Sequence, residues 1–213
     1  MVSSQSLPAS SSKLSQAKIL GIIGSLLPFI GVFIPYAGLV LGLVGLVLIL
    51  LALKYISDEV GEPRIFNYAI YSVVAGVVGY VVLVFFVVGV FLSGFLMRSL
   101  HREFPPISIP TYTWPYHALE SLDLVGLIIS IIAFLVLAWI VMIISTYFLR
   151  KSYSLVADRL GVELFRTVGL LYFIGAILLI VLVGGILILV ALILQIIAFI
   201  SLPESPPFKP QPA

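Results

Sequence analysis

The sequence contains no cysteine and few charged residues, which make up only 9% of the chain. The missing thiols exclude disulfide bonds, thiolate nucleophiles and thiolate metal sites. A soluble domain has roughly 25% charged residues, whereas this chain is 62% hydrophobic with a mean hydropathy of +1.29. The composition therefore predicts an integral protein of the cell membrane, whose first partner is the lipid bilayer.

The charged residues that do occur lie at the ends of the apolar runs or outside them. The net charge of +2 is spread over these boundaries, so we expect no nucleic-acid partner. No ionisable residue lies near the middle of a run, where pumps and ion-coupled carriers usually need one. No nucleophile elbow, phosphate loop, zincin helix or dinucleotide fingerprint occurs, and His117, Glu120 and Asp123 lack the clustered spacing of a metal motif. We expect neither an enzyme nor a cofactor, with no catalytic or metal-binding residues.

Four long uncharged runs supply the hydrophobicity, and each exceeds the ~18 residues that mark a spanning helix. The runs are residues 19–53, 65–97, 124–149 and 167–203. As single helices, the first and last would be about 52 and 55 Å long, which is too long for one crossing of a core about 30 Å thick. Pro28 and Pro35 give the first run a reason to break, and Gly184-Gly185 gives one to the last.

These breaks predict an all-α, polytopic bundle of about six transmembrane helices. The expected helices are residues 19–34, 36–57, 63–97, 118–157, 165–183 and 186–202. With six crossings, nine of the 11 basic residues face the cytoplasm, whereas four unbroken helices divide them five to six. The positive-inside rule therefore favours six crossings with both termini cytoplasmic. We expect a disordered Ser-rich leader (1–16), one membrane domain (17–202) and a disordered Pro-rich tail (203–213).

Small and polar residues within the runs indicate where helices pack. Gly38 and Gly42 have small-xxx-small spacing, and Gly45 follows one turn later, which permits close approach of two backbones. Gln195 is the strongly polar side chain deep in a helix, and we expect it to form a hydrogen bond between helices. The predicted packing residues are Gly38, Gly42, Gly45, Gly76, Gly79 and Gln195.

Four basic residues near the second charged loop could contact anionic lipid headgroups. They are Arg150, Lys151, Arg159 and Arg166. Orientation by the positive-inside rule alone also accounts for them, so both interpretations stay open.

The polar patches beside both inner loops resemble a known family. These patches are Leu53–Asp58, Pro63–Asn67, Tyr147–Ser152 and Leu164–Gly169. They look like the domain-of-unknown-function 996 family of mostly archaeal membrane proteins, and the likeness covers about residues 14–202. The resemblance implies a multi-spanning membrane protein and brings no established activity or catalytic residue.

Two classes of function fit these observations. The first is a non-catalytic scaffold or accessory subunit that acts by helix–helix association, with copies of itself or with other membrane proteins. The second is a small-molecule transporter or channel that uses the broken helices near Pro35 and Gly184-Gly185, since discontinuous helices can line a permeation path. The two classes differ in whether water reaches the middle of the bundle.

Overall fold

The computed structural model describes residues 13–31, 33–34, 37–103 and 116–204, without the side chains of residues 39, 93–103 and 116–124. It contains α1 (Lys13–Gly31), α2 (Gly38–Val60), α3 (Pro63–Glu103), α4 (Tyr116–Leu160), α5 (Glu163–Leu178), the 3-10 turn η1 (Leu179–Val181) and α6 (Val183–Ile200). In this described part, six helices are long and apolar enough to cross a membrane, and no strand occurs. The predicted all-α, six-helix architecture is confirmed.

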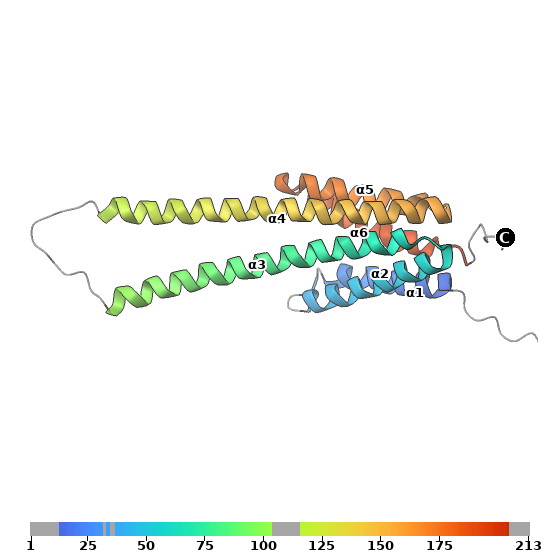
Figure 1. Cartoon of the computed structure of the whole chain (residues 1–213), viewed down its shortest axis with the longest axis horizontal. Helices are drawn as coiled ribbons and strands as arrows, with labels where there is room; N and C mark the ends of the chain where they lie inside the picture. Colours follow the sequence, from blue (N-terminus) through green and yellow to red (C-terminus); the bar gives the residue numbers. More distant parts are fainter. Residues whose placement is uncertain (1–12, 32, 35–36, 104–115, 205–213) are drawn as a thin grey trace, which may run out of the picture. The chain divides into compact units, whose positions relative to one another are not determined.

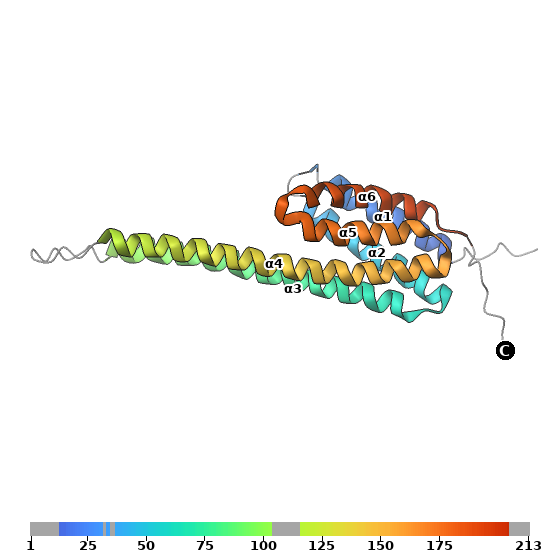
Figure 2. The ribbon, with the colours of Figure 1, turned by 90° about the horizontal axis from the view of Figure 1, so that it is seen from above.

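The chain divides into two compact units, with residues up to Val74 and from Ile143 in unit 1 and residues 75–142 in unit 2. In unit 1, α1 packs against α2 and α6, and α5 packs against α6. Figures 1 and 2 show these four helices beside the unit 1 segments of α3 and α4. The predicted tails fall largely on residues 1–12 and 205–213, outside the described residues. Helix α1 begins at Lys13, before the predicted start of the membrane domain, and Leu14 is fully buried.

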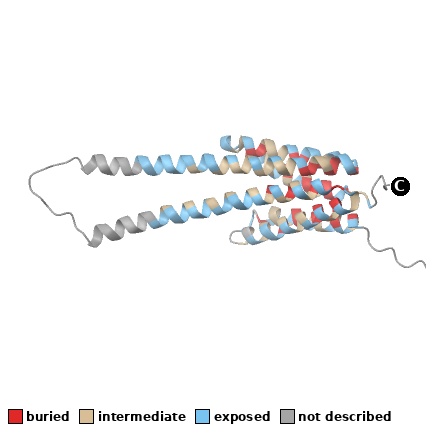
Figure 3. Ribbon diagram, viewed as in Figure 1, coloured by how far each residue is buried: buried red, intermediate tan, exposed pale blue. Residues whose placement is uncertain are grey.

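All six helices contribute buried side chains to one hydrophobic core in unit 1. Figure 3 shows these residues concentrated in this unit. At their centre, the ring of Phe165 meets Phe199 edge-on with centroids 5.1 Å apart, and meets Tyr153 at 5.6 Å. The three rings come from α4, α5 and α6, so they join the C-terminal hairpin to the long helix before it.

Two glycine turns lie at one end of unit 1, which we call the loop end. There α2 turns into α3 at Gly61 and α4 turns into α5 at Gly161, and both glycines are left-handed, with φ of 67° and 71°. Each donates its N–H to a carbonyl four residues earlier, Ser57 for Gly61 and Ala157 for Gly161. Glycine adopts this conformation without steric cost, so it ends each helix with a satisfied carbonyl. The start of α1 and the end of α6 lie at the same end (Figure 1), where Lys18 Nζ donates to the Leu202 carbonyl at 3.4 Å.

Within unit 1, α3 and α4 are joined by serine hydrogen bonds. Ser145 Oγ donates to the Ser72 carbonyl at 2.9 Å, and Ser152 Oγ donates to the Ile65 carbonyl at 2.7 Å. A hydroxyl that bonds to a carbonyl of a neighbouring helix stabilises the pair by about 0.6 kcal/mol in a membrane. The two bonds hold the first turns of α3 against the last turns of α4.

In unit 2, none of the described side chains is buried. Gly79 lies against Val141, where an added Cβ would be 2.8 Å from Cγ1 of Val141. The rings of Phe86 and Phe134 stack with centroids 4.0 Å apart. Figure 3 shows the described side chains of this unit as exposed or intermediate, and among the exposed ones Phe85 and Phe91 are exposed by 75% and 77%. Such a surface suits contact with lipid or with another membrane helix.

The break between α5 and α6 differs from the predicted one. It lies at Leu182, which is left-handed with φ 63°, and not at Gly184-Gly185. Gly184 belongs to the first turn of α6, where a side chain would overlap the backbone of Gly175 and Leu179. Its missing side chain therefore serves a close helix contact and not a turn. The break in the first run was predicted at Ile34–Tyr36, and here α1 ends at Gly31 and α2 begins at Gly38.

Candidate functional site

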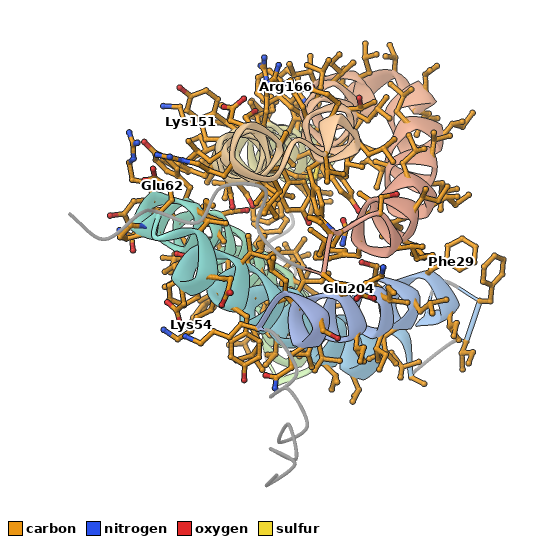
Figure 4. All side chains as sticks on the ribbon, turned by 90° about the vertical axis from the view of Figure 1, so that its right-hand side faces the viewer. Phe29, Lys54, Glu62, Lys151, Arg166 and Glu204 are labelled. Atoms are coloured by element: carbon orange, nitrogen blue, oxygen red, sulfur yellow. The ribbon has the colours of Figure 1, made fainter. Side chains whose placement is uncertain are left out.

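The described charged side chains of unit 1 lie toward its loop end, and a pocket lies among them. Its volume is about 420 Å³. It is lined by Arg64, Tyr68, Tyr147, Arg150, Lys151, Ser154 and Leu155. We call this the basic pocket, because three of its seven residues are cationic. Figure 4 looks at this end, with Lys151 and Glu62 on the same side of the molecule and Lys54 farther along it.

Helical spacing places these side chains on one face of each helix. Arg64 and Tyr68 are four apart on α3, and Tyr147 and Lys151 are four apart on α4, so each pair shares a face. The hydrogen bond from Ser152 to the Ile65 carbonyl then fixes the position of α4 along the axis of α3. The pocket is thus built from two rigid helices and contains no loop residue.

The cations of α4 lie over aromatic rings. Lys151 Nζ is 4.8 Å from the ring centroid of Tyr147 and 5.5 Å from that of Tyr68. Arg150 Cζ is 5.4 Å from the ring of Phe173 on α5. The electron-rich ring faces attract each cation and limit its movement. Among the described residues, neither Arg150 nor Lys151 forms an ion pair with a carboxylate.

Beside the basic pocket, Glu62 is held by two arginines. Its carboxylate accepts hydrogen bonds from Arg64 Nε at 2.7 Å and from Arg159 Nη2 at 2.5 Å, and its side chain is only 7% exposed. Hydrogen bonds from Arg64 first and Arg159 second lower the pKa of Glu62 to about 2, against the opposing effect of burial. Glu62 therefore stays ionised at neutral pH and joins the start of α3 to the end of α4.

The four predicted headgroup residues have different surroundings. Arg150 and Lys151 line the basic pocket. Arg159 is bonded to Glu62, and Arg166 pairs with Asp158 and with Glu163. Their contact with lipid stays a prediction. Arg64, Tyr68 and Tyr147 were not predicted as site residues, although the four-residue spacing of each tyrosine from a basic residue was a usable signal.

The predicted packing residues are also placed by the structure. An added Cβ at Gly45 would lie 2.5 Å from the Gly24 carbonyl oxygen, and one at Gly38 would overlap Gly31. Gly42 has no atom within 4 Å of that position, and Gly76 is exposed. As described above, Gly79 faces Val141. Gln195 Nε2 donates to Ser25 Oγ at 2.8 Å, which joins α6 to α1.

Metal ligands do not gather in the part of the chain whose side chains are described. No group of three His, Asp or Glu residues there could hold a metal ion. His101, His117, Glu120 and Asp123 lie outside the residues with described side chains.

Comparison with known proteins agrees with the resemblance found in the sequence. The chain is 38% identical over 192 residues to an uncharacterized protein of Methanocaldococcus jannaschii, an alignment that covers 90% of this chain and 94% of that relative. No solved structure matches it. A family model described as "Protein of unknown function (DUF996)" matches residues 41–193. The chain, whose described residues include six helices of membrane length, is therefore a member of this family of proteins of unknown function.

Proposed function

We propose that this protein is a non-catalytic component of the cell membrane that acts by helix–helix association, as a scaffold or accessory subunit. The loop end faces the cytoplasm in this proposal, together with both termini. The observation on which it rests is the hydrogen bond between Gln195 and Ser25, because it pairs two buried polar side chains of different helices.

These two polar groups satisfy each other inside the bundle. Gln195 is 2% exposed and Ser25 is fully buried. Ser25 Oγ accepts the hydrogen bond from Gln195 and donates its own hydrogen to the Gly21 carbonyl at 2.7 Å. A buried amide that has a protein partner needs no water. The pair therefore supports a closed interior over a water-lined path.

Glycine contacts close the space between neighbouring helices on both sides of this pair. Gly24 meets Gly45 between α1 and α2, and Gly175 meets Gly184 between α5 and α6. At each position two backbones touch without a side chain between them, which is the way membrane helices associate. A transporter that moves by opening these contacts would have to separate well-packed surfaces.

The exposed apolar surface of unit 2 supports association with a partner. Phe85 and Phe91 are the most exposed aromatic side chains on α3 in the described part. Lipid can cover such rings, and so can a second membrane helix. We expect either a second copy of the chain or another membrane protein on this surface.

Cysteine labelling tests the proposal, because the natural chain has no thiol. Ser25→Cys and Ala191→Cys place a thiol in the interior, and Glu163→Cys, which replaces a side chain that is 69% exposed, is the matched loop-end control. With a membrane-impermeant maleimide, only the Glu163→Cys protein should react, and in right-side-out vesicles only after they are opened. Labelling of Ser25→Cys would show water inside the bundle and favour a transporter or channel.

A second experiment tests association directly. Phe85→Cys in native membranes should give a crosslinked species with a thiol-reactive bifunctional reagent, and Glu163→Cys should not. Only monomer from both variants at every reagent concentration would contradict association through unit 2.

A further inference from the structure

We propose that the basic pocket binds the phosphate group of an anionic lipid headgroup, in the leaflet at the loop end. This inference concerns a binding site and does not depend on the scaffold proposal. It rests on the charge, the geometry and the surroundings of the pocket.

The charge of the loop end is distributed unevenly. Its described carboxylates mostly have basic partners: Asp58 pairs with Lys54, Glu62 with Arg64 and Arg159, and Asp158 and Glu163 with Arg166. Arg150 and Lys151 are left without a carboxylate partner in the described part of the chain. Both line the pocket beside Arg64, so the pocket has an excess of positive charge. An anion would supply the missing negative charge.

The donor groups suit a phosphate. An arginine offers a planar fork that can bind two phosphate oxygens at once, and a lysine adds a compact charge with three donors. Ser154, Tyr68 and Tyr147, whose side chains carry hydroxyl groups, also line the pocket. The rings of Tyr68 and Tyr147 hold the Lys151 ammonium between them, so an incoming anion would meet a group that is already positioned.

The surroundings favour a lipid as the source of the phosphate. On α3 and α4, about one turn farther from the loop end than the pocket, large hydrophobic side chains are exposed. Tyr71 on α3 is exposed by 52% and Ile144 on α4 by 45%. Tyrosine rings settle where hydrocarbon meets headgroups, and basic residues there attract anionic lipids. A bound lipid could therefore place its phosphate in the pocket and its chains along the apolar surfaces of α3 and α4 in unit 1.

Titration with a labelled lipid tests this assignment. The full chain in phosphatidylcholine nanodiscs is titrated with fluorescent phosphatidylglycerol, and the fluorescence gives the binding affinity. Native mass spectrometry counts the lipid molecules that are bound. A basic residue that contacts the headgroup of an anionic lipid contributes about 5-fold to its binding. We expect the double variant Arg150→Gln/Lys151→Gln to bind phosphatidylglycerol about 25-fold more weakly than the natural chain.

The matched control removes the same charge elsewhere at the loop end. Lys13→Gln/Lys54→Gln also loses two cations, neither of which lines the pocket. Its affinity should stay within 3-fold of the natural value. Equal losses in both double variants, or no preference for phosphatidylglycerol over phosphatidylcholine, would overturn the proposal.

Two further arms complete the test. Millimolar inorganic phosphate or glycerol 3-phosphate should not displace the lipid, and displacement through the same residues would assign the pocket to a free phosphate compound instead.

Should the double variant fail to fold, Ser154→Leu fills the pocket and keeps both charges. It should also weaken phosphatidylglycerol binding at least 5-fold, and unchanged binding would contradict the assignment.

Discussion

Two adjacent glycines at the start of α6 allow a sharp test of how the C-terminal hairpin packs. Gly184 is buried and touches the backbone of Gly175 and Leu179, whereas Gly185 has no atom within 4 Å of an added Cβ. Replacement of each by alanine changes one methyl group in the same helical turn. Opposite effects on stability are expected.

The magnitudes follow from two opposing contributions. Alanine is better than glycine inside a helix by about 1 kcal/mol, and this gain applies to both positions. At Gly184 the new methyl group also overlaps backbone atoms that cannot rotate away, and overpacking of this kind costs about 3 kcal/mol. Gly184→Ala should therefore lose about 2 kcal/mol, while Gly185→Ala should gain up to about 1 kcal/mol.

Thermal unfolding of the purified chain in one detergent measures both effects. With about 2–4 °C per kcal/mol for a chain of this size, Gly184→Ala should lower Tm by about 4–8 °C and Gly185→Ala should raise it by about 2–4 °C. Helical content by circular dichroism checks that both variants fold. If the two substitutions shifted Tm equally, the close contact between α5 and α6 would not exist in the form described.

Three further predictions concern polar contacts and backbone strain. Glu62→Gln should destabilise the chain by about 1–2 kcal/mol, because Arg159 and Arg64 lose a charged acceptor while staying partly solvated. The pKa of Glu62 is about 2 in the folded chain, compared with an ordinary value of 4.5. Its contribution to folding stability is therefore complete above pH 4.5 and is lost as the pH falls towards 2. A series of Tm values at different pH should show this loss in the natural chain and not in Glu62→Gln. Ser25→Ala should cost about 1–3 kcal/mol in detergent unfolding by leaving the amide of Gln195 unpaired, and adding Gln195→Leu should recover most of it; additive losses would contradict the pairing. Leu182→Gly should raise Tm by about 2–4 °C, because the left-handed leucine is 84% exposed and its strain is relieved at no packing cost; a lower Tm would refute this.

Much of the fold could be predicted because bilayer thickness limits helix length. Runs such as 19–53 and 167–203 cannot cross once, and the distribution of basic residues independently indicated six crossings. The turn at Gly61 falls in the gap between the predicted helices 36–57 and 63–97.

Other features depend on contacts that single-sequence patterns do not contain. The glycine at position 184 was predicted to mark a turn. In the structure Gly184 contacts Gly175, and the turn lies at Leu182. The arrangement around Glu62 joins residues 97 positions apart in the chain. The pocket likewise depends on how α3 and α4 are aligned along their axes. The pattern of apolar residues does not determine this alignment, because both helices are hydrophobic on nearly every side.

The serine bonds between α3 and α4 have a consequence for how this pair of helices finds its alignment. The contacts at Ile65 with Ser152 and at Ser72 with Ser145 are seven residues apart on each helix, which is two helical turns. Valine, isoleucine and leucine have similar size and hydrophobicity, so sliding one helix by one turn would change its apolar packing little. A slip of one turn would break both hydrogen bonds together and separate Glu62 from Arg159. In a nearly uniform apolar sequence, these few polar contacts select one sliding position among several of similar packing energy.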